Sequence, residues 1–524
     1  MLIINGVSLS INQKIEVLLD KIARELGITT QEIKEYKIAK RSLDARKKNK
    51  IIYVYNVIFL VENEDKYLAN NVKKYIEPTK EIAVVKSDKT VAVIGYGPAG
   101  IFAAYNLALS GVNVEVFERG ERVKERVKSV NNFLENGKLN TESNVQFGEG
   151  GAGTFSDGKL TARTKNPLIN FVYKTFVEAG ANSEISFVHN PHIGTDVLRK
   201  VVKNIRIKTI GLGAKIHFNS KVEKFNYIND KISSITVNGE ERVFDDYILA
   251  IGHSARDTFE ELKNINCEIK PKPFAVGFRI EHKQKMINKS QYKEMHDHPK
   301  LGAAEYRLKL QSSEGRGVYT FCMCPGGVVI PSQSEIDTVV VNGMSEFARN
   351  KKNANSAVLV TVGPEDIKGD DPLKMMYFQR DLEKKAFELG GSNYHAPVQL
   401  VRDYLRHTKS TALGEVVPSY QIGTTNKDLN LLFPGYVNKA LHQALRVFDH
   451  KIKGFSKSDA VITGVESRSS SPIWIMRERE SYNSLTYQNL YPCGEGAGFA
   501  GGITSSAIDG LKVSDIIIEK YLIK

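Results

Sequence analysis

The sequence predicts an α/β protein built around a parallel sheet, and three observations carry this prediction. A short apolar strand pattern runs directly into glycines at the spacing G-x-G-x-x-G over Val91–Gly100, and an apolar helix pattern follows over 101–110. A second strand pattern over 112–117 ends on Glu118. A second glycine-rich helix start, over 491–510, lies near the other end of the chain. Strand, glycine turn, helix and strand in this order form a βαβ unit of a parallel sheet.

The glycine turn predicts a dinucleotide site. Gly95 permits the tight turn, Gly97 lets a pyrophosphate approach the backbone, and Gly100 lets the helix pack closely on the strand. The free N–H groups and the partial positive charge of the helix N-terminus favour phosphate. Glu118 follows Gly95 by 23 residues, where a carboxylate can accept hydrogen bonds from ribose hydroxyls.

The bulk composition is that of a globular protein of several domains. The chain has 524 residues and a net charge of +13, which permits an acidic partner such as nucleic acid but equally suits scattered surface lysines. Only four cysteines are present, so we expect no disulfide framework and a cytoplasmic, reducing location. Neither a signal peptide nor an apolar window of about 18 residues is found, so we expect no membrane span.

Residues 1–85 are expected to form a small N-terminal α+β module. The patterns indicate a strand at 2–5, a helix over 12–26, a short helix opened by Thr29 and a strand over 51–61. The basic run Lys34–Lys50 could contact RNA, but a solvated face explains it as well. A linker is expected over 78–89.

Further elements follow the βαβ unit. Five glycines between Gly148 and Gly158 exclude a regular helix or strand and could let a flat ligand lie against the backbone. A helix is expected over 195–210, a hairpin around Asn238-Gly239, and a buried strand over 245–252 that ends on Gly252.

Residues 270–455 differ from the flanking segments in their secondary-structure patterns. Strand patterns lie near 274–280, 318–324, 328–330 and 338–341, and amphipathic helix patterns lie over 372–389 and 437–448. We therefore expect an inserted α+β domain that faces the substrate. The flanking segments 86–269 and 456–524 would form one discontinuous domain.

Four stretches together resemble flavoproteins of the glutathione-reductase-type superfamily. Gly95–Gly100 with Glu118 resembles the motif for FAD adenosine and pyrophosphate, and Ala250-Ile-Gly252 resembles a strand-end motif. Cys493-Gly-Glu495 resembles the motif for the ribityl chain, and Gly501-Gly-Ile503 resembles the helix start that faces the flavin. The whole chain also resembles a family of bacterial proteins known only as FAD-dependent dehydrogenases.

The resemblance implies FAD as the cofactor and a Rossmann-type FAD-binding domain that carries the inserted domain. Two departures stand out: Glu495 replaces the usual aspartate, and a second G-x-G-x-x-G for NAD(P)H is missing, so a nicotinamide or other electron donor would bind only transiently at the flavin. The residues expected to bind the cofactor are Gly95, Gly97, Pro98, Ala99, Gly100, Glu118, Arg119, Gly150, Gly151, Gly153, Thr154, Val222, Ala250, Gly252, Gly494, Glu495, Gly501, Gly502 and Ile503.

Four side chains are candidates for chemistry. Lys159 follows the glycine loop, and the alternative for it is a surface lysine. Arg468 could hold a substrate carboxylate or a phosphate, or stabilise its loop. Cys322 and Cys324 would point to one face of a strand, as a dithiol or as small buried residues. No cysteine or histidine grouping indicates a metal site.

The expected function is therefore an FAD-dependent oxidoreductase for a small organic substrate. The alternatives are a nucleic-acid-modifying flavoprotein of the kind that acts on tRNA, a lipid reductase, and a flavin-binding scaffold without catalytic activity.

Overall fold

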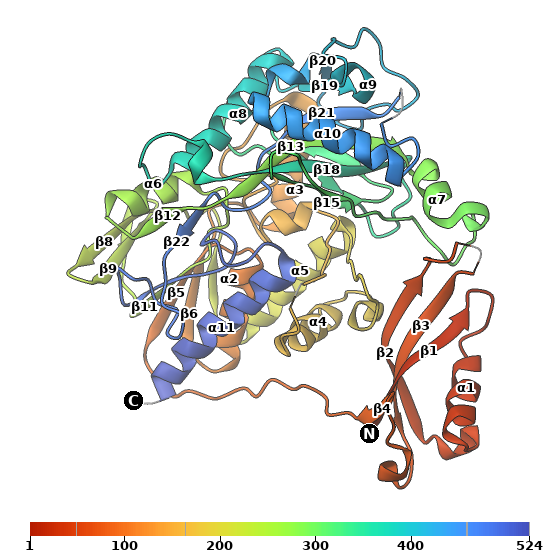
Figure 1. Cartoon of the computed structure of the whole chain (residues 1–524). Coiled ribbons are helices and arrows are strands. Elements are labelled where there is room, and N and C mark those ends of the chain that lie inside the picture. The colour runs from red at the N-terminus through yellow and green to blue at the C-terminus, as the bar shows by residue number, and fades with distance from the viewer. Residues whose placement is uncertain (49, 163, 457–458, 523–524) are drawn as a thin grey trace.

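The computed structural model of the chain describes residues 1–48, 50–162, 164–456 and 459–522. A five-stranded parallel sheet, in the order β23-β11-β5-β6-β7, lies below a larger sheet in the view of Figure 1. Its strands are β5 (Thr90–Ile94), β6 (Asn113–Phe117), β7 (Lys215–His217), β11 (Asp246–Leu249) and β23 (Leu490–Pro492). Val91 pairs with Val114 on one side and with Asp246 on the other. The predicted mixed α/β class with a parallel sheet is confirmed.

Helix α2 (Pro98–Leu109) completes the predicted βαβ unit and is buried over nearly its whole length. It is apolar on all sides because it lies between the parallel sheet and α11 (Ile503–Leu522). The two helices approach closely at Gly510, where a Cβ would lie only 2.2 Å from the carbonyl oxygen of Ala99. Helix α4 (Leu168–Glu178) contacts α11, and α5 (Thr195–Gly211) contacts α2, whereas Val130 of α3 (Val123–Asn136) packs in a small cluster with Phe155 and Ile330.

A three-stranded antiparallel sheet with helix α6 (Arg256–Asn264) flanks the parallel sheet. Its strands are β8 (Val222–Ile228), β9 (Lys231–Val237) and β10 (Glu240–Arg242). The predicted hairpin turn is present: Asn238 and Gly239 both have positive φ, 49° and 81°. These angles match the twist of the two strands they join.

A seven-stranded sheet, in the order β14-β15-β18-β13-β21-β19-β20, forms the upper half of the molecule, and α8 and α10 cover its upper face (Figure 1). Its strands are β13 (Phe274–Lys283), β14 (Lys309–Gln311), β15 (Gly317–Cys324), β18 (Asn353–Val362), β19 (Ala396–Leu400), β20 (Thr424–Asn426) and β21 (Val461–Glu466). The helices around it are α7 (Gln284–Tyr292), α8 (Lys374–Gly390), α9 (Val401–Tyr404) and α10 (Gly435–Lys451). Two short strand pairs complete this part of the chain. Strand β16 (Val328–Pro331) pairs with β17 (Val341–Met344), and β12 (Ile269–Pro271) pairs with β22 (Ile473–Ile475).

The expected division at residues 455 and 456 falls before β21. This strand pairs with both β13 and β19, so it belongs to the upper sheet, and the chain returns to the parallel sheet only after it. Only β13 and β15 of this sheet correspond to strand patterns recognised in the sequence. The other five strands, β14, β18, β19, β20 and β21, correspond to none of them.

The N-terminal module is a four-stranded sheet, β2-β3-β1-β4, with one helix against it. Its elements are β1 (Leu2–Ser10), α1 (Val17–Leu26), β2 (Glu35–Asp44), β3 (Ile52–Leu60) and β4 (Val72–Lys74). Thr29 opens only a short 3-10 turn, and most of the basic run is strand β2. Arg41 in β2 exchanges backbone hydrogen bonds with Phe187 and His189, which docks the module on the rest of the chain.

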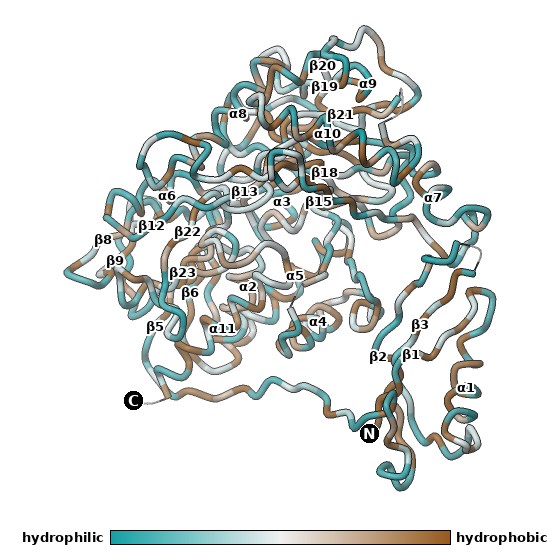
Figure 2. Tube along the Cα trace, in the orientation of Figure 1, coloured by the Kyte–Doolittle hydropathy of each residue, from teal (hydrophilic) through white to brown (hydrophobic). Residues whose placement is uncertain are grey.

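The expected linker is extended and partly docked. Lys80 forms an ion pair with Asp515 of α11 at 2.6 Å, and the backbone N–H of Val85 donates to Ser110. Figure 2 shows apolar residues along β1 and β3 and in the parallel sheet, and polar residues at the outer turns. Among the described residues, no helix combines the length and the apolar character that crossing a membrane requires.

His282 of β13 should make stability depend on pH. Its Nε2 lies 2.7 Å from the Phe455 carbonyl oxygen, and its buried Nδ1 has no partner. Burial lowers the pKa of His282 to about 4, below the unfolded value of about 6.5. The unfolded chain therefore binds the extra proton, and stability present above about pH 6.5 is lost as the pH falls towards about 4.

The test is urea unfolding of the wild type and of His282→Gln at about pH 7.5 and about pH 5. The wild type should lose about 2 kcal/mol more than the variant over this interval. Equal losses would show that His282 does not take up the proton on unfolding.

Candidate functional site

One extended cavity lies between the parallel sheet and the seven-stranded sheet. It collects residues from the ends of β5, β6 and β11, from the glycine loop over 148–158, from the lower face of the upper sheet and from the start of α11. Most candidates named from the sequence line it: Gly95, Gly97, Pro98, Ala99, Glu118, Arg119, Gly151, Gly153, Lys159, Val222, Ala250, Gly252, Cys322, Arg468, Glu495, Gly501, Gly502 and Ile503.

Five candidates are absent from the lining: Gly100, Gly150, Thr154, Gly494 and Cys324. Thr154 is buried and donates to the carbonyl of Glu149, and a Cβ at Gly150 would lie 2.1 Å from its hydroxyl. Gly494 donates its N–H to Asp509 of α11 at 2.7 Å. Thr154, Gly150 and Gly494 therefore support the loops around the cavity without lining it.

The three glycines of the β5–α2 turn differ in their steric surroundings. Gly95 has a φ of 97°, and a Cβ there would lie 2.5 Å from the Ala250 carbonyl oxygen. A Cβ at Gly100 would lie 2.0 Å from the Gly95 carbonyl oxygen, so only glycine lets helix and strand pack. At Gly97 the nearest atom to a Cβ is 3.8 Å away, which leaves open space on the cavity side.

Glu118 is largely occupied by the protein's own backbone. Its carboxylate accepts from the N–H groups of Tyr96 at 2.7 Å, Gly120 at 2.9 Å and Gly148 at 2.9 Å. A carboxylate has about four acceptor positions, so one remains rather than the two that a pair of ribose hydroxyls would need. Glu118 thus joins the β5–α2 turn to the glycine loop and can accept one more hydrogen bond.

Arg126 of α3 holds the glycine loop in place, and the sequence analysis did not identify it. Its fully buried guanidinium donates to the carbonyls of Asn144, Val145, Gly148 and Glu149 at 2.7–3.2 Å. Arg126 shares the buried face of α3 with apolar residues at helical spacing, and this spacing is the signal that could have identified it. Because four carbonyls are fixed, the loop can present its backbone to the cavity without ordering on binding.

The end of the cavity near β6 is lined by paired charges. Arg119 donates to Glu142 at 2.7 Å and to Asp257 at 2.5 Å, and Lys221 contacts the same two carboxylates at 3.3 and 2.7 Å. Burial alone would raise the pKa of Asp257, but hydrogen bonds from Arg119 and Lys221 outweigh it and hold the pKa well below its usual range.

The middle of the cavity contains two titratable groups with shifted pKa values. Burial, with Arg468 and Arg256 nearby, lowers the pKa of His253 to about 3, so this imidazole is neutral. Burial raises the pKa of Glu495 to about 7, and the charge of Lys272 only partly opposes this. The Glu495 side chain makes no hydrogen bond within the described part of the chain, which leaves it free to bind a ligand.

Lys159 belongs to a buried ion cluster. Its ammonium donates to the carbonyl of Met323 and lies 3.0 Å from Asp157 and 3.6 Å from Glu305, while Arg349 binds the same two carboxylates at 2.5 and 2.8 Å. Burial favours a lower pKa for Lys159, but Asp157 and Glu305 outweigh it and raise the pKa. Lys159 is thus a paired cation at the cavity wall rather than a surface lysine.

Cys322 and Cys324 do not share a face. A bulge between Phe321 and Cys324, with a φ of 44° at Cys322, breaks the alternation of β15. Only Cys322 therefore lines the cavity, and Cys324 is fully buried beside Arg279. Burial raises the pKa of both thiols, that of Cys324 to about 12, which disfavours the reactive thiolate.

The lower face of the upper sheet also contributes Glu466 and Asn342, which the sequence analysis did not identify. Glu466 ends β21, and both of its carboxylate oxygens accept from one nitrogen of the buried Arg279, at 2.9 and 3.2 Å. The same nitrogen lies 3.4 Å from Oδ1 of Asn342 in β17. Burial raises the pKa of Glu466, although Arg279 opposes the shift.

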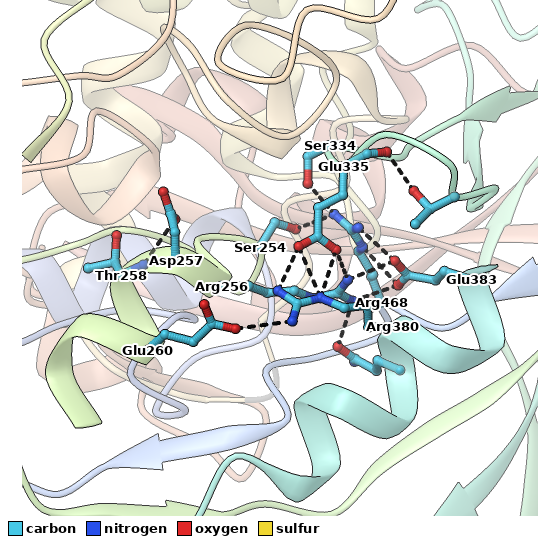
Figure 3. A network of polar contacts seen from close by, with 12 residues as sticks. Ser254, Arg256, Asp257, Thr258, Glu260, Ser334, Glu335, Arg380, Glu383 and Arg468 are labelled. Carbon is cyan, nitrogen blue, oxygen red and sulfur yellow. Dashed lines mark hydrogen bonds and ion pairs between the residues drawn. The ribbon is translucent and has the colours of Figure 1, made fainter. Parts of the chain in front are cut away.

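Arg468 reaches the cavity from a network of buried ion pairs that Figure 3 shows from close by. Its guanidinium donates to Glu383 at 2.8 and 3.0 Å and to the hydroxyls of Ser254 and Ser334 at 3.0 and 2.7 Å. Arg256 approaches the same Glu383 carboxylate from the other side, at 2.7 and 2.9 Å. Arg468 is therefore a stabilising residue in the described structure, with its charge already balanced.

A model for the family described as "FAD-dependent protein, C-terminal domain-like" matches residues 273–469, and a model for a domain of unknown function matches residues 1–59. An "Uncharacterized protein" of Clostridium beijerinckii is 49% identical over 526 aligned residues, which cover 99% of this chain and 98% of the relative. The chain belongs to a family of bacterial FAD-dependent proteins.

Two solved structures share much less sequence with this member of the FAD-dependent family. CtdE in complex with FAD is 11% identical, with 83% of this chain and 88% of that one covered and a TM-score of 0.32. Glycine oxidase from Bacillus cereus is also 11% identical, with 82% and 97% covered and the same TM-score. Similarity at this level assigns no role to any residue of this chain.

The cavity suits FAD, the cofactor of the family. The N-termini of α2 and α11 both open on it, and each offers N–H groups that have no partner within its helix. Where a Cβ would stand at Gly252 or Gly501, no atom lies within 4 Å. A long cavity with two helix N-termini and open glycines between them matches an extended dinucleotide.

Proposed function

We propose that this protein is an FAD-dependent oxidoreductase that acts on a small organic substrate. The observation that carries the proposal is the composition of the cavity: backbone and glycine on the parallel-sheet side, and polar side chains of the upper sheet on the other. Such a cavity can hold a cofactor against one wall and a second molecule against the other.

The residues that would hold FAD follow from their contacts. The N–H groups at the start of α2 would bind the pyrophosphate, and the remaining acceptor position of Glu118 would take one ribose hydroxyl. Glu495, which has no hydrogen bond in the described structure, would accept from the ribityl chain. The positive end of the α11 dipole would face the ring system. Bound FAD supplies two-electron redox chemistry, and the protein supplies orientation and exclusion of water.

The electron donor is the second part of the proposal. Gly211 and Gly213 terminate α5 and do not follow a strand, so they form no second dinucleotide turn. We infer that NAD(P)H or another electron donor binds transiently at the exposed face of the flavin and dissociates after electron transfer.

The alternatives receive less support from the charges. In the basic run, Lys34 pairs with Glu62, Lys37 with Glu77 and Arg41 with Glu184, which neutralises part of the surface that RNA would need. The wall of the upper sheet carries buried ion pairs, which do not suit a lipid tail. All four cysteines are free, and on that basis we propose a cytoplasmic location.

Anaerobic titration of the purified, flavin-loaded protein tests the oxidoreductase proposal. The visible absorbance of the flavin should bleach on addition of NADH or NADPH and return when an organic electron acceptor is added. A protein that holds FAD but is bleached by neither nicotinamide, nor by any amine or alcohol supplied, would be a flavin-binding scaffold instead.

A further inference from the structure

The cations that line the cavity are already paired with carboxylates. This holds for Arg119 and Lys221 with Asp257, for Lys159 with Asp157, and for Arg468 with Glu383. Among the described lining residues, these four are the lysines and arginines. An anionic ligand would therefore find no free positive side chain, and it would have to break an internal ion pair to gain one.

The wall that the upper sheet contributes consists of Phe321, Cys322, Asn342, Glu466, Arg468 and Ser469. Most of its polar groups are used internally. Arg468 is held by Glu383 and two serines, and the Ser469 hydroxyl both donates to and accepts from the backbone of Ala275. The Cys322 thiol is only a weak donor.

Glu466 and Asn342 retain unused hydrogen-bonding capacity on this wall. The Glu466 carboxylate accepts from one nitrogen, so part of its acceptor capacity is free. Oδ1 of Asn342 accepts from the N–H of Gly343 at 2.8 Å and from Arg279, whereas its Nδ2 donates to no described residue. Because Arg279 contacts both side chains, a free acceptor and a free donor lie next to each other.

We infer that Glu466 and Asn342 form a binding site for an uncharged or cationic organic ligand with an O–H or N–H donor beside a carbonyl-type acceptor. Glu466 accepts from the donor of the ligand, and the Asn342 amide donates to its acceptor. Arg279 positions both side chains from behind. The inference rests on the proposed function and names the class of substrate that this wall recognises.

Charge decides which ligands of this shape bind. A hydroxyl or ammonium group beside a carboxamide satisfies both side chains. When a carboxylate replaces the carboxamide, the ligand brings a negative charge close to Glu466 without a free cation to balance it. In a partly buried cavity, an unfavourable contact of this kind costs more than it does in water.

Three molecules with one carbon frame test this. Lactamide is neutral, alaninamide carries an ammonium group, and lactate is an anion. Calorimetric titration of the flavin-loaded full chain should give lactamide and alaninamide dissociation constants at least about tenfold lower than that of lactate, a difference of about 1.4 kcal/mol. Equal or tighter binding of lactate, or no binding of either amide, would overturn the inference.

Two variants assign the selectivity to the named residues. Glu466→Gln should reduce the preference for lactamide over lactate to less than about twofold. Asn342→Asp keeps the internal contacts of Oδ1 and replaces the donating nitrogen by oxygen, so lactamide should bind at least about tenfold more weakly. Glu240→Gln, the same charge change on the exposed strand β10, is the control and should leave every dissociation constant unchanged.

A selectivity that survives in both site variants would also overturn the assignment. Should Glu466→Gln fail to fold because Arg279 loses its partner, the wild-type ligand series and Asn342→Asp still decide the question. These titrations measure binding, whereas the proposed oxidoreductase function is tested by bleaching of the flavin, so failure of one is distinguishable from failure of the other.

Discussion

Replacement of Glu383 by alanine is expected to lower the free energy of unfolding by about 3–5 kcal/mol. Its side chain is fully buried and accepts from Arg256 and Arg468, which are themselves buried, and from the hydroxyl of Ser467 at 2.7 Å. Burial alone would raise the pKa of Glu383, but the two arginines outweigh it and hold the pKa below its usual range. Removal of the carboxylate leaves two guanidinium groups without their shared partner.

The neighbouring Glu335 provides a matched control. It also binds two arginines, Arg256 and Arg380, but its side chain is 28% exposed, so water can replace it. Glu335→Ala should therefore cost clearly less, about 1 kcal/mol. Urea unfolding of both variants, followed by fluorescence and circular dichroism, measures the difference. Equal losses in the two variants would mean that the network around Glu383 is hydrated and not a buried cluster.

Such a network also marks the limit of sequence-based prediction in this protein. Arg256 begins α6 beside the parallel sheet, Glu383 lies in α8, and Arg468 follows β21. Arg256 and Glu383 look like ordinary surface charges in their own segments, and Arg468 is recognised only as a candidate for ligand binding or loop stabilisation. Their burial becomes visible only when the two sheets are placed against each other, because the pairing depends on tertiary contacts and not on local pattern.

The elements that the sequence does predict are local. The turn Gly95–Gly100 is recognised from local pattern: a Cβ at Gly95 or Gly100 would clash with a backbone carbonyl, whereas Gly97 leaves space on the cavity side. Glu118 is also predicted from local pattern, because it ends the strand that follows the glycine turn. Three backbone N–H groups nevertheless occupy most of the acceptor positions of its carboxylate. By contrast, β18 lies between β15 and β13 and β21 between β13 and β19, pairings that join distant parts of the chain.

One local rule fails at Cys322. Alternation along a strand places residues i and i+2 on the same face, and this predicted that both thiols share one face of the strand. The bulge at Cys322 adds a residue and turns only one thiol towards the cavity. Sequence alone gives no sign of such a bulge here, because the residue with positive φ is neither glycine nor asparagine.

Replacement of Gly501 by valine is expected to weaken FAD binding at least about tenfold while leaving the fold of the protein intact. Gly501 lines the cavity just before α11, and a Cβ there would meet no protein atom within 4 Å. Its φ lies outside the left-handed range, so a side chain adds no backbone strain. The added methyl groups would occupy space that only the cofactor needs.

The variant Gly435→Val is the control for any general effect of replacing a glycine by valine. Gly435 begins α10, it also has no atom within 4 Å of a Cβ, and it is absent from the cavity lining. Gly435→Val should therefore keep its full flavin content, whereas Gly501→Val should be purified nearly colourless with an unchanged far-ultraviolet circular dichroism spectrum. Added FAD should restore colour only at concentrations at least about tenfold higher than the wild type needs.

If Gly501→Val instead holds FAD as tightly as the wild type, the start of α11 does not contact the cofactor. The flavin-facing role of Gly501–Ile503 would then be wrong, even though the site around Gly95–Gly100 could still bind the adenosine half.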